Sequence, residues 1–352
     1  MSAVALRDHL RRRFPALFAF YKRHVRRHIA RHDSHYDIAS WVNQGLALRT
    51  RLNLVDVCLE RDGAWFTDVR GLQWSFDPEI WGSTLGAATG SVHESAEIDA
   101  ICNYLDHSSV VVDIGANIGT FALPVSRATK ARVIAVEPVS STFALLNANI
   151  CRNRADDAIT TVQAAVGDFA GEVIVTTDAQ SANHVLVGQA AARAGEELVP
   201  VITLDVLLQD EPRIDLIKVD VEGLELNVMH GARKTLARHA PAVLLEIERR
   251  WTTRYAYEPD DIFAFMAQSG YGYQALTSEG PAQATSVIAD LKRANNFLFL
   301  PGGSARACKP GQSASSEIID EPSHPGGIGA HCRVVKHLRA KGRGHMSQYR
   351  RT

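Results

Sequence analysis

Acidic side chains and glycines recur in the sequence at points where short apolar runs end. The segment VVVDIGANIGTF places Asp113 directly after three valines and follows it with Gly115 and Gly119. A strand, a glycine-rich turn and a helix in this order direct backbone N–H groups and a helix N-terminus at a ligand. The glycine spacing differs from G-x-G-x-x-G, the pattern that admits a dinucleotide pyrophosphate. Because Asp113 would repel a diphosphate, the segment favours a ligand that carries positive charge.

A second acid, Glu137, ends the next predicted strand, 24 residues after Asp113. A carboxylate at this position can accept hydrogen bonds from both hydroxyls of a ribose. The pair fits S-adenosylmethionine, whose ammonium and sulfonium groups are cationic and whose ribose offers two hydroxyls. A helix N-cap at Asp113 and a surface acid at Glu137 are the structural alternatives, which their joint occurrence disfavours. Asp168 follows the third strand, where we predict either a contact with adenine or only a turn before Gly171. The predicted cofactor residues are Asp113, Gly115, Asn117, Gly119, Glu137 and Asp168.

The elements that position these residues alternate between strand and helix. Strands are predicted over 110–113, 131–138, 159–166, 215–220 and 242–248, and helices over 118–128, 140–153, 222–238 and 259–269. This alternation predicts an α/β fold, a doubly wound and mostly parallel sheet with helices on both faces. The segments YGYQAL and NNFLFL have no predicted helix between them, so an antiparallel hairpin is expected at the end of the sheet.

The two ends of the chain differ from this body. Residues 10–31 have apolar side chains at steps of three and four among arginines, which predicts a basic amphipathic helix within 1–32. Residues 33–105 are predicted to form an extension with a β-meander over 52–78 and a helix over 92–105. This extension is a candidate lid over an acceptor substrate. The alternating strands and helices, with the acids at their ends, form a domain assigned to 106–300. The Gly-, Pro- and Ser-rich residues 301–352 predict a disordered basic tail.

From residue 92 to 300 the chain resembles the FkbM-type S-adenosylmethionine-dependent methyltransferases. The resemblance rests on VVVDIGANIGTFAL, VIAVEPVSSTFALLNANI, AAVGDFAGEV, VITLDVLL, DLIKVDVEGLELNVMHGARKTL and AVLLEIE, in this order. LIKVDVEGLE is the most specific of these blocks. The resemblance implies the Rossmann-like methyltransferase fold, with a seven-stranded sheet in the order 3-2-1-4-5-7-6 and an antiparallel strand 7.

The predicted fourth strand carries the candidate catalytic residues. Asp220 and Glu222 lie at its carboxyl end, beside the switch point where open sheets bind ligands. Methyl transfer to an alcohol needs in-line alignment and a group that takes the proton. Asp220 is the first candidate for orienting the acceptor or accepting its proton, and Lys218 on the same strand face can hold its charge. Glu222 is equally suited to cap the following helix, and Glu246 is a further candidate for the acceptor pocket. No metal ligands are assigned, because the number of carboxylates alone does not indicate a divalent metal.

Charge is unevenly distributed in a chain of 352 residues with a net charge of −1. Residues 1–32 carry nine Lys and Arg against one acid, and residues 331–352 carry seven and no acid. The remaining 22 basic and 38 acidic residues give the body a net charge of −16. Five scattered cysteines without a CxxC pair fit a reducing compartment, and no apolar run reaches the ~20 residues of a membrane span. We therefore expect a cytoplasmic protein.

These observations predict a methyltransferase that acts on a hydroxyl of a small metabolite, a sugar or a lipid-linked glycan. A nucleic-acid methyltransferase that uses the basic arms is a second hypothesis, which the acidic body disfavours. A non-catalytic module that only binds the cofactor is a third. The helix over 10–31 either contacts an anionic membrane as a peripheral anchor or docks on the body or a second subunit. The sequence leaves the acceptor and the oligomeric state open.

Overall fold

The computed structural model describes residues 56–60, 63–76, 98–177, 183–186, 191–277, 280–284 and 286–302. The predicted basic helix over 10–31 lies outside these residues, and so does the predicted tail from residue 303 onward. The fold is given below for the described residues.

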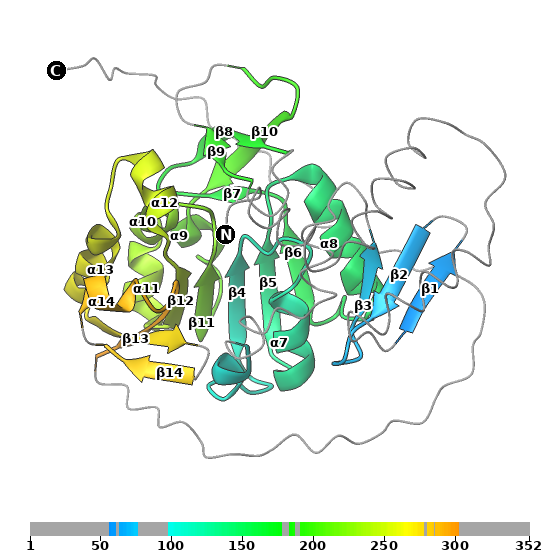
Figure 1. The fold of residues 1–352 in the computed structure, drawn as a ribbon, viewed down its shortest axis with the longest axis horizontal. Helices are drawn as coiled ribbons and strands as arrows, with labels where there is room; N and C mark the ends of the chain where they lie inside the picture. The colour runs from blue at the N-terminus through cyan, green and yellow to red at the C-terminus, as the bar shows by residue number, and fades with distance from the viewer. Residues whose placement is uncertain are drawn as a thin grey trace.

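An eight-stranded sheet forms the centre of the molecule (Figure 1). Its strand order is β14-β13-β15-β12-β11-β4-β5-β6. The run from β12 to β6 is parallel, whereas β15 is antiparallel to both β12 and β13. Without the edge strand β14, this is the predicted order 3-2-1-4-5-7-6, and the Rossmann-like methyltransferase fold is confirmed. The strands are β4 (Val110–Ile114), β5 (Arg132–Val136), β6 (Ile159–Val162), β11 (Leu216–Val219), β12 (Ala242–Glu246), β13 (Tyr271–Thr277), β14 (Gly280–Gln283) and β15 (Asn296–Pro301).

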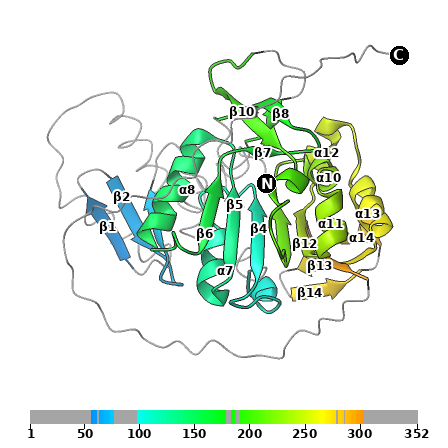
Figure 2. The same ribbon diagram turned by 180° about the vertical axis from the view of Figure 1, so that it is seen from behind.

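Helices cover both faces of this sheet, as the two opposite views show (Figures 1 and 2). On one face, α7 (Ala122–Thr129) and α8 (Ser140–Arg152) pack their apolar side chains on β4 and β5. The helices packed on the other face are α9 (Leu204–Leu207), α10 (Glu225–His230), α11 (Arg233–His239) and α13 (Pro259–Gln268). Because β4 is covered on both sides, its five residues are all buried, which explains its unbroken apolar sequence.

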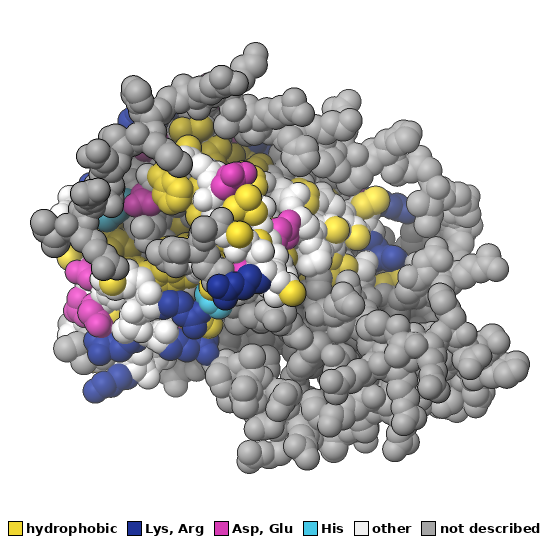
Figure 3. Space-filling view, turned by 90° about the horizontal axis from the view of Figure 1, so that it is seen from above, with side chains coloured by type: hydrophobic (Ala, Val, Ile, Leu, Met, Phe, Trp, Pro, Cys, Tyr) yellow, Lys and Arg dark blue, Asp and Glu magenta, His cyan; other side chains and the backbone are white. Residues whose placement is uncertain are grey.

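A second, smaller sheet lies at the carboxyl ends of the central strands (Figure 1). It consists of β7 (Ala165–Val166), β8 (Gly171–Thr176), β9 (Val185–Leu186) and β10 (Glu196–Ile202), in the order β7-β10-β8-β9. The single strand predicted over 159–166 is therefore wrong, because β6 ends at Val162 and β7 pairs with β10 in the other sheet. Seen from above, this end of the molecule exposes apolar side chains with a few acids among them, and a group of Lys and Arg side chains beside them (Figure 3).

Two further predictions of secondary structure are corrected. The helix predicted over 222–238 begins only at Glu225 and is divided at Gly231. A Cβ on Gly231 would stand 2.0 Å from the carbonyl oxygen of Gly167, so the chain crosses the start of the second sheet at this glycine. The two strands of the predicted hairpin, β13 and β15, do pair. However, β14 and the helix α14 (Val287–Asp290) lie between them in the chain.

The predicted β-meander is present as β1 (Asp56–Glu60), β2 (Gly63–Thr67) and β3 (Gln73–Phe76). Asn149 of α8 and Asn153, the residue that follows this helix, connect it to the domain. Asn153 Oδ1 accepts the Gln73 N–H at 2.9 Å, and Asn149 Oδ1 accepts the Ser75 N–H at 2.8 Å. The fully buried Asn149 also donates its Nδ2 to the Ile118 carbonyl at 3.0 Å. One amide therefore joins the meander to the glycine-rich turn.

Asn149→Ala should lower the free energy of unfolding by about 2 kcal/mol, because the buried Ile118 carbonyl and the part-buried Ser75 N–H lose their hydrogen-bond partner. Urea denaturation followed by circular dichroism measures the change. Asn147→Ala is the matched control: it lies on the same helix but is only half-buried, so water can replace its bonds. Equal losses in the two variants would contradict a special role of Asn149.

Candidate functional site

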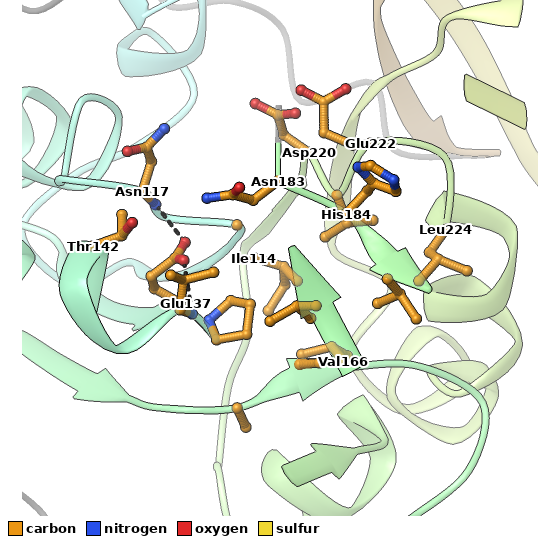
Figure 4. Close-up of a pocket in the computed structure, with 18 residues that line it drawn as sticks. Ile114, Asn117, Glu137, Thr142, Val166, Asn183, His184, Asp220, Glu222 and Leu224 are labelled. Carbon is orange, nitrogen blue, oxygen red and sulfur yellow. Dashed lines mark hydrogen bonds between the residues drawn. The ribbon is translucent and has the colours of Figure 1, made fainter. Parts of the chain in front are cut away.

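A cavity opens where β4, β5 and β11 end, beneath residues of the second sheet (Figure 4). It contains about 700 Å³ of atom-free space, part of which is open to solvent. Glu137, Asn117 and Thr142 stand at one end, and Asp220, Glu222 and His184 gather at the other. The cavity therefore lies at the switch point of the doubly wound sheet, where ligands of such folds bind.

The glycine-rich turn forms one wall of this cavity. Gly115 has a φ of +78°, and a Cβ there would stand 1.9 Å from the carbonyl oxygen of Asp220. Gly119 has a φ of +98°, and Asn117 between them is also left-handed at +51°. The glycine at 115 is thus required by contact with the end of β11. A larger residue at this position would disturb the fold, so its effect on ligand binding could not be separated from its effect on folding.

Glu137 is held by the same turn. Its Oε2 accepts the N–H of Asn117 at 3.0 Å, and its Oε1 accepts the N–H of Val139 at 3.1 Å. The side chain is buried, and burial raises the pKa of Glu137 to about 7, although the two N–H bonds oppose the shift. Each oxygen keeps a lone pair for a further donor. Glu137 lines the cavity with its carboxylate fixed in position.

Asn117 offers a second polar group at this end. Its Oδ1 is buried and has no hydrogen-bond partner among the residues that the structure describes. A buried carbonyl oxygen without a partner costs free energy, so this atom suits a ligand with an N–H or O–H donor. Ala164, Ala165 and Val166 supply an apolar surface in the same cavity. The lining residues therefore fit a ligand with a flat apolar part and several hydrogen-bond donors.

Asp113 is placed differently from Glu137. It is fully buried in β4 and does not line the cavity. Its Oδ1 lies 3.7 Å from Lys218 Nζ, and burial raises the pKa of Asp113 while Lys218 opposes the shift. The carboxylate thus faces a lysine of the neighbouring strand, whereas the sequence favoured a direct contact with a cationic ligand.

Lys218 links Asp113 to the end of the cavity that Asp220 lines. Its Nζ lies 3.1 Å from Asp220 Oδ2, and its side chain is only 14% exposed. Burial alone would lower the pKa of Lys218, but Asp220 and Asp113 outweigh it and raise the pKa. The predicted charge pairing between Lys218 and Asp220 is therefore present, with Asp113 as a third member.

Two further carboxyl groups stand near Asp220. Burial, followed by the charges of Asp220 and Glu225, raises the pKa of Glu222 to about 9. Burial and Asp220 also raise the pKa of Glu246, which accepts a hydrogen bond from Asn295 Nδ2 at 2.8 Å. Glu222 lines the cavity, whereas Glu246 does not. The raised pKa favours the protonated form of Glu222, which is a hydrogen-bond donor.

Asp168, the remaining residue predicted to contact the cofactor, lies outside the cavity and accepts a hydrogen bond from Asn227 Nδ2 at 3.2 Å. The sequence reasoning missed Thr142, Asn183 and His184, which do line it. Thr142 belongs to the first turn of α8. Because the sequence predicts a helix over 140–153, directly after Glu137, this first turn could have been recognised as part of the site. Asn183 and His184 precede the two-residue strand β9, where no sequence pattern points to a site.

Among the residues that the structure describes, no group of three or more His, Cys, Asp or Glu is arranged to hold a metal ion. Within the same residues, no helix has the length and apolar character needed to cross a bilayer.

The strand order and the cavity at the switch point define a Rossmann-like methyltransferase fold. Residues 113–274 match the family model described as Methyltransferase FkbM domain, which confirms the resemblance seen in the sequence. Methyltransferase sdnD of Sordaria araneosa is 29% identical over 159 residues, 36% of this chain and 61% of that protein. Hexuronic acid methyltransferase AglP of Haloferax volcanii is 28% identical over 166 residues, 47% of this chain and 64% of that protein. The chain thus spans about three fifths of the length of these relatives.

Solved structures of methyltransferases are also similar to the chain. Methyltransferase FkbM from Methylobacillus flagellatus has 18% sequence identity and a TM-score of 0.38, covering 64% of this chain and 55% of its own. TYW2 of M. jannaschii in complex with AdoMet has 12% identity and a TM-score of 0.33, covering 69% of this chain and 82% of its own.

Proposed function

We propose that the protein is an S-adenosylmethionine-dependent methyltransferase that methylates a hydroxyl group of a small metabolite, a sugar or a lipid-linked glycan. The observation that carries the proposal is the carboxylate of Glu137. It is buried at the end of β5, fixed by two backbone N–H groups and directed into a cavity at the switch point. The match of residues 113–274 to the FkbM methyltransferase family supports the same reaction.

The residues present fit this cofactor. Glu137 would hold the ribose hydroxyls, and the unpartnered Oδ1 of Asn117 would accept a further hydrogen bond from the ligand. When bound, the cofactor supplies an electrophilic methyl group on a sulfonium. Asp113 acts indirectly, because its charge fixes Lys218, which in turn fixes Asp220.

At the acceptor end, Asp220 and Glu222 would orient the hydroxyl that is methylated. Lys218 keeps the carboxylate of Asp220 in place, where it can accept the hydrogen bond of an alcohol. The protonated form of Glu222, which its raised pKa favours, can donate to a second oxygen of the acceptor. This acidic end disfavours an anionic group at the reacting position, which favours a hydroxyl over a carboxylate. The hexuronic acid methyltransferase among the relatives makes a sugar the first acceptor to test.

The affinity for S-adenosylmethionine should fall as the pH drops below about 7. Ribose hydroxyls donate to an ionised carboxylate, so protonation of Glu137, whose pKa is raised to about 7, competes with binding. Proton linkage then weakens binding by up to about tenfold per pH unit.

The raised pKa of Glu137 also affects folding. The contribution of Glu137 to folding stability is greatest below pH 4.5 and is lost as the pH rises to about 7.

Calorimetric titrations between pH 5.5 and 8.5 measure this dependence. The ligand has an amino group of its own, so the quantity of interest is the difference between the wild type and Glu137→Gln. That variant should bind more weakly and lose the dependence below pH 7. A wild type whose affinity is the same at pH 5.5 and 7.5 would contradict the role of Glu137.

Methyl transfer itself is tested with cofactor labelled in the methyl group and a cell extract that is then divided into lipid, glycan, nucleic-acid and small-molecule fractions. The proposal expects label in the glycan, lipid-linked or small-molecule fraction. Label in nucleic acid would favour the second hypothesis, in which the basic arms contact phosphates. Cofactor binding without any transfer would favour the non-catalytic module.

We also propose domain boundaries at residues 33, 106 and 301 and membrane contact through residues 10–31, as the sequence predicts.

A further inference from the structure

We propose that Glu225 is a positioning residue that, with Tyr257, holds the loop after β11 (residues 220–224) in the shape that the acceptor site requires. The inference rests on the proposed function, in which Asp220 and Glu222 of this loop orient the hydroxyl that is methylated. Both acids line the cavity (Figure 4). Glu225 and Tyr257 do not line it, and they contact the backbone of the loop instead.

The backbone of this loop has an unusual conformation. Glu222 has a φ of +55°, in the left-handed region that residues other than glycine seldom adopt, and Gly223 has a φ of +108°. A left-handed glutamate costs free energy and persists only where its surroundings fix it. A Cβ on Gly223 would stand 2.8 Å from the backbone of Trp251, so the loop is packed closely on the segment behind it. The direction of the Glu222 side chain therefore depends on the contacts that hold this backbone.

The carboxylate of Glu225 holds the N–H groups of the loop. Glu225 is the first residue of α10 and is only 2% exposed. Its Oε1 accepts the N–H of Gly223 at 3.0 Å and the N–H of Val221 at 3.4 Å. Because Val221 and Gly223 flank Glu222 in the chain, one carboxylate oxygen holds the backbone on both sides of this acid.

The hydroxyl of Tyr257 holds the carbonyl side of the same loop. It donates to the Gly223 carbonyl at 2.6 Å and lies 3.2 Å from Oε2 of Glu225. The hydroxyl has a single proton, which the shorter contact uses, so a donor on Glu225 would complete the second contact. Burial raises the pKa of Glu225 to about 7, which makes the protonated form accessible. A glutamine at this position would offer the same pattern of one acceptor oxygen and one donor.

The alternative is that Glu225 only stabilises the start of its helix, and Asp205 shows what such a role looks like in this chain. Asp205 accepts the N–H of Lys234 at 3.1 Å and the N–H of Thr235 at 2.8 Å in the first turn of α11, and it does not line the cavity. Glu225 differs, because the N–H groups that it accepts precede its helix and one of them belongs to Val221, which lines the cavity. Loss of Asp205 should therefore affect stability alone, whereas loss of Glu225 should also affect turnover.

Glu225→Ala should lower kcat by about tenfold or more at saturating cofactor, because a misplacement of about 1 Å in the acceptor site suffices for such a loss. The rate is measured as label transferred to the extract fraction that the wild type labels. Cofactor affinity should stay within about twofold, since Glu137 lies at the other end of the cavity. Glu225→Gln should keep kcat within about twofold of the wild type, because the amide reproduces the hydrogen bonds.

Asp205→Ala is the matched control, because it also removes a carboxylate that accepts two backbone N–H groups. It should lose stability in urea denaturation and keep the wild-type kcat. Wild-type kcat in Glu225→Ala, or an equal loss of kcat in Glu225→Ala and Glu225→Gln, overturns the proposal. An equal loss in Glu225→Ala and Asp205→Ala overturns it as well.

Tyr257→Phe is a milder variant that tests the same loop if Glu225→Ala fails to fold. It keeps the ring and removes the hydrogen bond to the Gly223 carbonyl, so kcat should fall by about threefold or more. Tyr273→Phe is its control, since Tyr273 donates to Asp290 Oδ2 at 3.0 Å and neither residue lines the cavity. Equal kcat in the two tyrosine variants overturns the role of Tyr257.

Amide hydrogen exchange tests the loop without turnover. Relative to the amides of β4, which report global opening, exchange at Val221 and Gly223 should be about tenfold or more faster in Glu225→Ala than in the wild type and in Glu225→Gln. Unchanged protection of these amides in Glu225→Ala overturns the proposal for any acceptor. A wild type that protects them and yet fails to bind S-adenosylmethionine refutes the proposed function itself, which distinguishes the two failures.

Discussion

Lys218→Met should lower the free energy of unfolding by about 3–5 kcal/mol at pH 7, because removing one partner of a buried ion pair leaves the other uncompensated. Asp113 is fully buried, and neither of its oxygens has a hydrogen-bond partner among the described residues, so Lys218 is the counter-charge on which it depends. Methionine keeps most of the side-chain volume, which limits the effect to charge. Denaturant unfolding at pH 7 measures the change.

The matched control is the double variant Asp113→Asn with Lys218→Met, which removes both charges and should recover most of the loss. The pH dependence gives a second check. Because burial raises the pKa of Asp113 in the folded state, protonating it relieves the penalty, and the loss in Lys218→Met should shrink as the pH falls toward 4. A Lys218→Met variant with wild-type stability, or a double variant less stable than the single one, would contradict the ion pair as described.

Asp220→Asn should lower kcat by about 10²-fold and leave the affinity for the cofactor within about twofold. The substitution keeps the shape of the side chain and removes the charge that Lys218 holds and that would align the acceptor hydroxyl. Misalignment of about 1 Å in such a reaction can cost a factor of this size. Methyl transfer at saturating cofactor gives kcat, and calorimetry gives the affinity.

Asp210→Asn is the control for this substitution, since Asp210 is exposed and stands away from the cavity. The two effects of Asp220→Asn separate an acceptor role from a cofactor role. An unchanged kcat would remove Asp220 from the acceptor site. A large loss of cofactor affinity with little change in kcat would assign it to the cofactor instead.

The central sheet was predictable because its strands are short, unbroken runs of β-branched residues. Val110, Val111 and Val112 are buried on both sides, and the structure gives the same strand with one more residue. The divided helix was not predictable, because the break at Gly231 depends on the backbone of Gly167, more than sixty residues away. The second sheet was missed for the same reason: β7 has two residues and is defined only by its pairing with β10.

The sequence was sufficient to place the site residues at the ends of strands. Asp113, Glu137 and Asp220 all stand where strands of the central sheet end, as their sequence context indicated. Sequence alone could not tell which side chain reaches the cavity. Alternate residues of a strand point to opposite faces, and the burial of Asp113 against Lys218 depends on the register of β4 with β11. His184 could not be found from the chain, because its place in the wall depends on the packing of the second sheet over the first.

Calorimetric titration of S-adenosylmethionine into the wild type, Glu137→Gln and Asp168→Asn tests the cofactor site most directly. Both variants exchange a carboxylate for an amide of the same shape, but only Glu137 lines the cavity. We expect the wild type to bind, Glu137→Gln to bind at least about tenfold more weakly because charge-assisted hydrogen bonds are lost, and Asp168→Asn to bind as the wild type does. No binding by the wild type, or equal affinity of the wild type and Glu137→Gln, would contradict a cofactor site at this cavity.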